Sequence, residues 1–164
     1  MISGMLLESS RATAAVDLDG GRLSSLVIDG LEVLVTEGEK PSRWGSFPMI
    51  PWCGRLPYGV LEFGNEHFQF PLTSPPHANH GRTHLQAWSP TGPSTIRTEL
   101  VEPWPYAGHA IQRFELTDHT LTVTAEVHAD AVAMPAMIGW HPWFRRKLDR
   151  GETAELSFEA ALIY

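Results

Sequence analysis

The sequence has almost no cysteine and an excess of acidic over basic residues. Cys53 is the single cysteine in 164 residues, which excludes an internal disulfide framework and is typical of a reducing compartment. Lys and Arg number 12 against 19 Asp and Glu, so the net charge is −7, and basic residues form no run. Nucleic-acid binding requires a basic surface, so the composition argues against a nucleic-acid partner.

Long apolar runs and helical patterns are missing as well. No stretch approaches the ~18 consecutive apolar residues of a membrane-spanning helix. The N-terminus lacks the basic region and apolar core of a signal peptide. We therefore expect no membrane partner and a cytoplasmic location. The 13 prolines and 14 glycines disfavour long helices, whereas a 43% hydrophobic content and the chain length fit one folded domain over residues 1–164.

Alternation of apolar and polar residues with a period of two is the strongest pattern present. Residues 121–127 and 110–116 both show it and flank a turn at 118–119, which predicts an antiparallel hairpin. Dipeptides that favour tight turns predict two more hairpins, around 64–65 and around 29–30. The sequence thus predicts an all-β fold, an antiparallel β-sandwich, with a distorted barrel as the alternative.

Three segments interrupt this alternation and are rich in Pro, Gly, His and Trp. They cover residues 41–59, residues 73–93 and the stretch "IGWHPWF" at 138–144. Long loops on a β scaffold commonly carry function, so we expect the functional residues there. The six tryptophans could belong to the core or could serve as platforms for a ligand ring.

The final residues, "AELSFEAALIY" at 154–164, resemble the beginning of a strand, with Leu156 and Phe158 alternating. A sandwich that ends on a fresh strand is expected to be incomplete at the C-terminus. An unpaired strand tends to pair with another chain. We therefore expect self-association through this C-terminal strand, with Leu162 also poorly covered.

Histidines and one arginine are the candidate functional side chains. His141 lies among large apolar residues, either as a core histidine bonded to backbone carbonyls or as a site residue. His77, His80 and His84 have a spacing that could bind zinc, with exposed loop histidines as the alternative and no acidic residue nearby. Arg55 is either a surface charge or a guanidinium directed at ligand oxygens.

Taken together, Arg55, His80 and His141 suit a polyhydroxylated ring. Arginine and histidine donate hydrogen bonds to hydroxyls, and tryptophan covers the apolar face of a sugar. Histidine also exchanges a proton near neutral pH, as a general acid or base must. The residues alone therefore indicate a β-rich sugar-binding protein or sugar enzyme.

Three stretches carry a more specific resemblance. They are, in order, "GSFPMIPWCGRLPYGVLEFGNEHFQFPL", "NHGRTHLQAW" and "MPAMIGWHPWF". Together they resemble the galactose mutarotase (aldose 1-epimerase) family over about residues 20–145. The resemblance implies a β-supersandwich and an isomerase that interconverts the α and β anomers of an aldohexose by acid–base ring opening. It implies that neither a metal nor an organic cofactor is needed.

The same resemblance assigns roles by position. Arg55 would contact sugar hydroxyls, His80 would hold the substrate near its ring oxygen, and His141 would be the general acid toward that oxygen. Among the tryptophans, Trp140 is the candidate for substrate binding. The chain differs from the family at Gly54, where asparagine is usual, and at Trp143, where tyrosine is usual.

The family's general base, a glutamate, and a sugar-binding aspartate both lie well downstream of the His-Pro motif. This chain ends at Tyr164 before either occurs, so it resembles the N-terminal part of a member and is expected to be truncated. Two other functions stay open. One is a non-catalytic carbohydrate-binding module that lacks the base, and the other is a metal-dependent enzyme that uses His77, His80 and His84.

Overall fold

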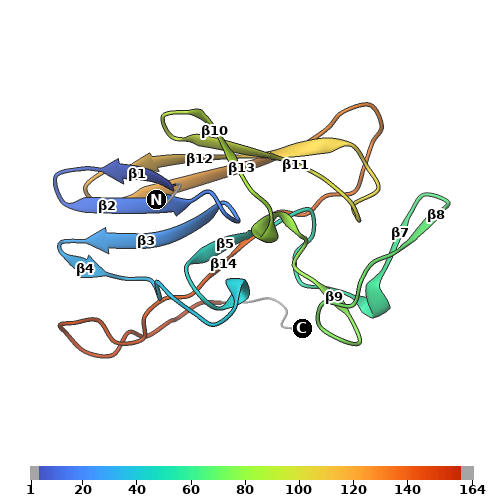
Figure 1. Ribbon diagram of the computed structural model, residues 1–164. Coiled ribbons are helices and arrows are strands. Elements are labelled where there is room, and N and C mark those ends of the chain that lie inside the picture. Colours follow the sequence, from blue (N-terminus) through green and yellow to red (C-terminus); the bar gives the residue numbers. More distant parts are fainter. Residues whose placement is uncertain (1–3, 160–164) are drawn as a thin grey trace.

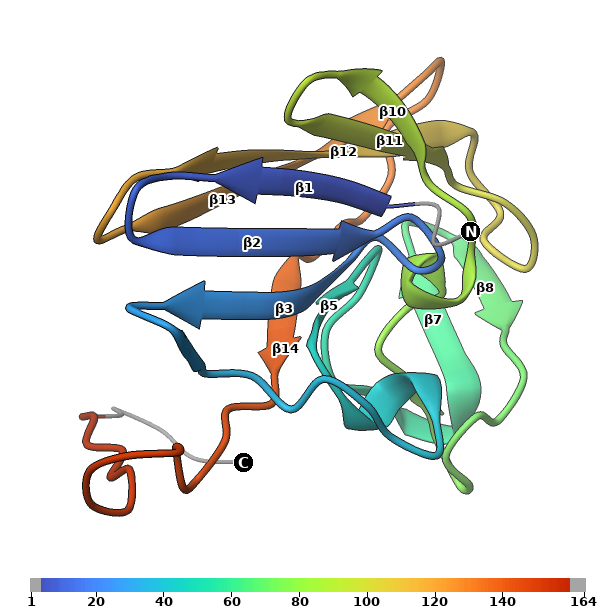
Figure 2. The same ribbon diagram turned by 60° about the vertical axis from the view of Figure 1, so that its left-hand side comes forward.

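Two antiparallel sheets packed face to face form most of the protein (Figures 1 and 2). The structure is a computed structural model and describes residues 4–159. The first sheet has the order β1-β2-β3-β5-β14, with β4 attached to β3. Its strands are β1 (Gly4–Glu8), β2 (Ala12–Asp17), β3 (Arg22–Ile28), β4 (Leu31–Glu32), β5 (Ser46–Met49) and β14 (Gly139–Pro142).

The second sheet has the order β10-β11-β12-β13. Its strands are β10 (Ser89–Gly92), β11 (Thr95–Glu99), β12 (Gly108–Leu116) and β13 (Leu121–Ala129). Two short ladders pair β6 (Arg55–Leu56) with β9 (Ala78–Asn79) and β7 (Val60–Phe63) with β8 (Glu66–Gln69). Three 3₁₀ turns complete the described part: η1 (Pro41–Arg43), η2 (Pro57–Gly59) and η3 (Thr83–Leu85). The prediction of an all-β antiparallel sandwich is confirmed.

The three predicted hairpins are all present. Strands β12 and β13 pair antiparallel with Leu116 opposite Leu121, and β7 pairs with β8 across the turn at 64–65. Strand β3 pairs with β4 across Asp29 and Gly30, both with positive φ, as a tight hairpin turn requires. In the part of the chain that is described, no helix is long and apolar enough to cross a membrane.

The space between the two sheets is filled by the apolar faces that the alternation predicted. In β12, Ala110 and Phe114 are buried, and they share one hydrophobic cluster with Val16 of β2. Gln112 of the same face is also buried, and its Nε2 donates to the carbonyl of Gly21 at 2.7 Å. This hydrogen bond satisfies a buried amide and joins the two layers.

Part of "IGWHPWF" is a strand rather than a loop. Strand β14 pairs with β5, with His141 opposite Phe47 and Trp140 opposite Pro48. Both faces of this strand are partly covered, so it shows no apolar–polar alternation and the pattern did not reveal it. For the same reason, β5 was missed within residues 41–59, where Phe47 and Pro48 are both buried.

The predicted C-terminal strand is wrong as far as the structure describes the chain. Residues 154–159 form no strand, and Leu156 and Phe158 are 83% and 71% exposed. Leu162 lies outside the described residues. The expected self-association through this segment therefore stays a prediction without a strand to support it. Within the described residues, β14 is an edge strand of the first sheet and β13 is an edge strand of the second.

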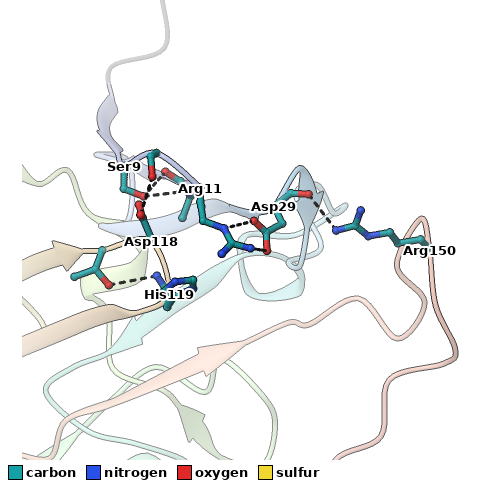
Figure 3. A network of polar contacts seen from close by, with 9 residues as sticks. Ser9, Arg11, Asp29, Asp118, His119 and Arg150 are labelled. Atoms are coloured by element: carbon teal, nitrogen blue, oxygen red, sulfur yellow. Dashed lines mark hydrogen bonds and ion pairs between the residues drawn. The ribbon is translucent and has the colours of Figure 1, made fainter.

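A polar network fastens the turns at one end of the sandwich (Figure 3). Arg11 donates to both carboxylate oxygens of Asp29, at 2.7 and 2.8 Å, and the pKa of Asp29 is lowered by this hydrogen bond. Ser10 Oγ donates to Asp118 at 2.7 Å, and Arg150 donates to the Asp29 carbonyl at 3.3 Å. The contacts join three hairpin turns to residues 145–153, and their exposure makes each of them individually weak.

Candidate active site

A cavity of about 460 Å³ opens beside the paired strands β5 and β14. Its wall draws on the loop before β5, the β6–β9 ladder, η3 and the end of β14. The lining side chains are polar, basic or aromatic: Lys40, Ser42, Arg43, Phe47, Arg55, Thr73, Ser74, Asn79, His80, His84, His141 and Trp143. The three segments that lack alternation in the sequence therefore meet at one cavity.

His141 lies half-buried in the cavity wall, not in the core. Pairing of β14 with β5 sets its ring on that of Phe47, with centroids 4.9 Å apart and planes 10° apart. Trp143, just past the end of β14, stacks on it with ring centroids 5.3 Å apart. Nδ1 of His141 is buried and has no hydrogen-bond partner among the described residues. The aromatic neighbours therefore fix the plane of the ring.

His80 meets His141 edge to face, with ring centroids 5.3 Å apart. Its Nδ1 accepts a hydrogen bond from the amide of Gly54 at 3.2 Å, and its own amide donates to the Gly54 carbonyl at 2.9 Å. An accepting Nδ1 leaves the proton of the neutral ring on Nε2. Burial, then the charges of His141 and Arg55, lower the pKa of His80. His80 is therefore a neutral hydrogen-bond donor at pH 7.

Arg55 reaches the same cavity from β6, where it lies opposite Asn79 of β9. The ladder therefore ties Arg55 to the residue that precedes His80. The His80 backbone has a φ of 61°, in the left-handed region that costs a non-glycine residue free energy. The structure thus brings Arg55, His80 and His141 to one cavity.

Trp140, by contrast, is not brought to the cavity. It neighbours His141 in β14, and successive side chains of a strand point to opposite faces. Its Nε1 donates to Oε1 of Gln112 at 3.0 Å, between the two sheets. Trp143 lines the cavity in its place. Trp52, Trp88 and Trp104 are buried in the core.

The three histidines whose spacing could bind zinc do not gather. His77 does not line the cavity with the other two, and its Nδ1 accepts from the amide of Tyr58 at 3.2 Å. Within residues 4–159, no three His, Cys, Asp or Glu side chains are placed so that they could hold a metal ion. His80 and His84 both line the cavity instead.

His84 is a cavity residue that the sequence analysis considered as a metal ligand or as an exposed loop histidine. It is 8% exposed and lies against the ring of Phe47 at 5.0 Å. Arg22 is also buried and donates to the carbonyls of Pro41 and Trp44. Burial first, and then the charge of Arg22, lower the pKa of His84 to about 4. The cavity wall therefore holds an imidazole here that is neutral at pH 7.

Comparison with known proteins identifies the family. The family model described as aldose 1-epimerase matches residues 5–160. The chain belongs to the aldose 1-epimerase family. The resemblance drawn from the three sequence stretches is thereby confirmed. A search of curated proteins found no match.

Solved structures of aldose 1-epimerase-like proteins share this fold. A putative aldose 1-epimerase from Escherichia coli K12 superposes with a TM-score of 0.75 at 23% identity, over 87% of this chain and 52% of its own. A galactose mutarotase-like protein from Clostridium acetobutylicum gives 0.74 at 17% identity, over 86% and 50%. One from Lactobacillus casei gives 0.70 at 23%, over 87% and 50%. The chain thus spans about half the length of these proteins.

The buried neutral state of His84 predicts a pH dependence of stability. The pKa of His84 is about 4 in the folded protein and about 6.5 in the unfolded chain. Between these two pH values the unfolded chain therefore binds a proton that the folded chain does not bind. The free energy of unfolding should fall by about 3 kcal/mol as the pH drops from 6.5 to 4. Urea denaturation across this range measures it, and His84→Phe should flatten the curve. An equally steep curve for the variant would contradict the assignment.

Proposed function

We propose that this member of the aldose 1-epimerase family binds an aldohexose in the cavity and interconverts its α and β anomers. The observation that supports the proposal is the meeting of His80, His141 and Arg55 at one cavity, next to the aromatic rings of Phe47 and Trp143. Donors suit the hydroxyls of a sugar, and aromatic rings suit its C–H face. A cytoplasmic location and a single domain stay predictions.

In the proposed mechanism, His141 protonates the ring oxygen of the sugar. Loss of the proton from the anomeric hydroxyl breaks the C1–O bond and gives the open-chain aldehyde. Rotation about C1–C2 is followed by closure of the ring on the other face. In this step the anomeric oxygen regains a proton and the ring oxygen returns its proton to His141. His80, neutral with its proton on Nε2, donates a hydrogen bond near the ring oxygen and holds it toward His141. Each positioned proton transfer contributes about 10²–10⁴-fold.

The described part of the chain offers no carboxylate for the second proton transfer. No Asp or Glu of residues 4–159 is among the side chains that line the cavity. Water or a dissolved base must then accept the anomeric proton. We therefore expect the chain to bind sugar and to exchange anomers more slowly than a family member of full length.

Magnetisation-exchange NMR on glucose and galactose at anomeric equilibrium tests this proposal. The expected result is sugar binding with an exchange rate above that of buffer alone, with sedimentation on the same sample reporting the oligomeric state. Binding with no added exchange would favour the non-catalytic carbohydrate-binding module. The absence of both sugar binding and added exchange would overturn the proposal.

Arg55→Ala should weaken sugar binding by about 1–3 kcal/mol, the scale of a lost hydrogen bond to a charged group. Titration calorimetry or NMR shift titration measures the change in affinity. Arg146→Ala is the matched control, because Arg146 is an exposed arginine that does not line the cavity. Equal affinity in the Arg55 variant would make Arg55 a surface charge.

A further inference from the structure

The cavity is positively charged although the protein is acidic. Lys40, Arg43 and Arg55 line it together with three histidines, and none of the Asp and Glu side chains of the described residues does. The whole chain nevertheless has a net charge of −7. The charge at the cavity is therefore opposite in sign to that of the rest of the molecule.

The three cations at the cavity are not neutralised by ion pairs. Within residues 4–159, none of them forms a salt bridge, although Arg11, Arg97, Arg113 and Arg145 elsewhere on the molecule do. Glu37 and Glu39 precede Lys40 in the chain but do not line the cavity. Cations that share a cavity repel one another, so an anion that enters it is attracted by all three.

Two of these cations flank one short turn. The amide of Arg43 donates to the carbonyl of Lys40 at 3.0 Å, which closes the turn around η1. The guanidinium carbon of Arg43 lies 5.8 Å from the centre of the Trp143 ring, which itself stacks on His141. The cation–π contact holds this charge one aromatic ring away from the proposed acid.

A neutral sugar is served by Arg55 and by the Asn, Ser and Thr side chains of the cavity, and it does not call for the two further cations Lys40 and Arg43. We propose that the substrate is an aldose that carries an anionic group, a phosphate or a carboxylate, held by Lys40 and Arg43 while its ring lies at His80 and His141. The inference rests on the proposed function and names its substrate class. Guanidinium and ammonium groups are the usual partners of both anions.

Affinities for four compounds test the inference: glucose, glucose 6-phosphate, glucuronate and inorganic phosphate. We expect one or both anionic sugars to bind at least about tenfold more tightly than glucose, as charge-assisted hydrogen bonds would provide. The gain should shrink as sodium chloride is added, and the better anionic sugar identifies the group. Equal affinities for all three sugars would overturn the inference and leave the proposed function standing. Inorganic phosphate binding as tightly as the sugar phosphate would also overturn it.

Charge-matched variants locate the effect. The double variant Lys40→Gln/Arg43→Gln should lose the tenfold preference, measured in that variant as the ratio of its affinities for the anionic sugar and for glucose. The control Arg146→Gln/Lys147→Gln removes the same two charges from exposed positions that do not line the cavity and should keep the preference. A preference that survives in the first pair, or falls equally in both, would overturn the assignment to Lys40 and Arg43. If the native chain binds none of the three sugars, that result would instead count against the proposed function.

Discussion

Gly81→Ala should lower the free energy of unfolding by about 3–5 kcal/mol. A Cβ at this position would lie 1.9 Å from the carbonyl oxygen of Ile50, and the φ of +63° is strained for any residue with a side chain. The contact cannot relax easily. The same carbonyl accepts hydrogen bonds from the amides of Arg82 and Thr83 and from the Thr83 hydroxyl. Both Ile50 and Thr83 are fully buried.

A matched glycine separates strain from steric overlap. Gly64 has nearly the same φ, +61°, but nothing lies within 4 Å of an added Cβ. Gly64→Ala should therefore cost only the conformational part, about 1–2 kcal/mol. Urea denaturation of both variants gives the difference. Similar losses in the two would show that Gly81 is held by its backbone angle alone, and that the close approach to Ile50 carries no weight.

The position of Gly81 links this stability to the site. It follows His80 directly and lies three residues before His84, and both histidines line the cavity. Its close approach to Ile50 sets residues 80–84 against the end of β5, which carries Phe47. The fraction of Gly81→Ala protein that still folds should therefore also bind sugar poorly, since the imidazoles of His80 and His84 would be displaced from the cavity wall.

Local sequence predicted the parts of the fold that local interactions specify. The hairpins at 29–30, 64–65 and 118–119 each depend on a turn and on strands adjacent in sequence. Pairing of β5 with β14 joins residues about ninety positions apart, and no turn signal marks it. Because both strands are at least partly covered on both faces, their sequences lack the alternation that reveals a strand with one solvated face.

The site shows the same division. His80, His141 and Arg55 could be found because their residue types suit one chemistry and because the family resemblance orders them. The choice between Trp140 and Trp143 needed the register of β14, since a shift of one residue exchanges the two faces of a strand. His84 was underestimated because burial against Phe47 and Arg22, which keeps its imidazole neutral, is a property of the folded chain.

His141→Asn should remove the anomer exchange that the protein adds to the buffer rate, a loss of about 10²–10⁴-fold. Asparagine keeps a hydrogen-bond donor of similar reach but has no proton to give to the ring oxygen. Sugar affinity should fall by less than about 1.5 kcal/mol, since only a single hydrogen bond changes. His67→Asn is the matched control, because His67 is exposed on the β7–β8 hairpin and pairs with Glu62.

Addition of a dissolved base separates the role of His141 as the acid from the acceptance of the anomeric proton by a base. No carboxylate of residues 4–159 lines the cavity, so acetate that enters it can accept the anomeric proton and raise the exchange rate of the native chain. His141→Asn should not respond, because the base supplies nothing to the ring oxygen. Magnetisation-exchange NMR at increasing acetate concentration compares the native chain, His141→Asn and His67→Asn. An equal response in the His141 variant would show that another group protonates the ring oxygen, and His141 would then be a stacking residue between Phe47 and Trp143.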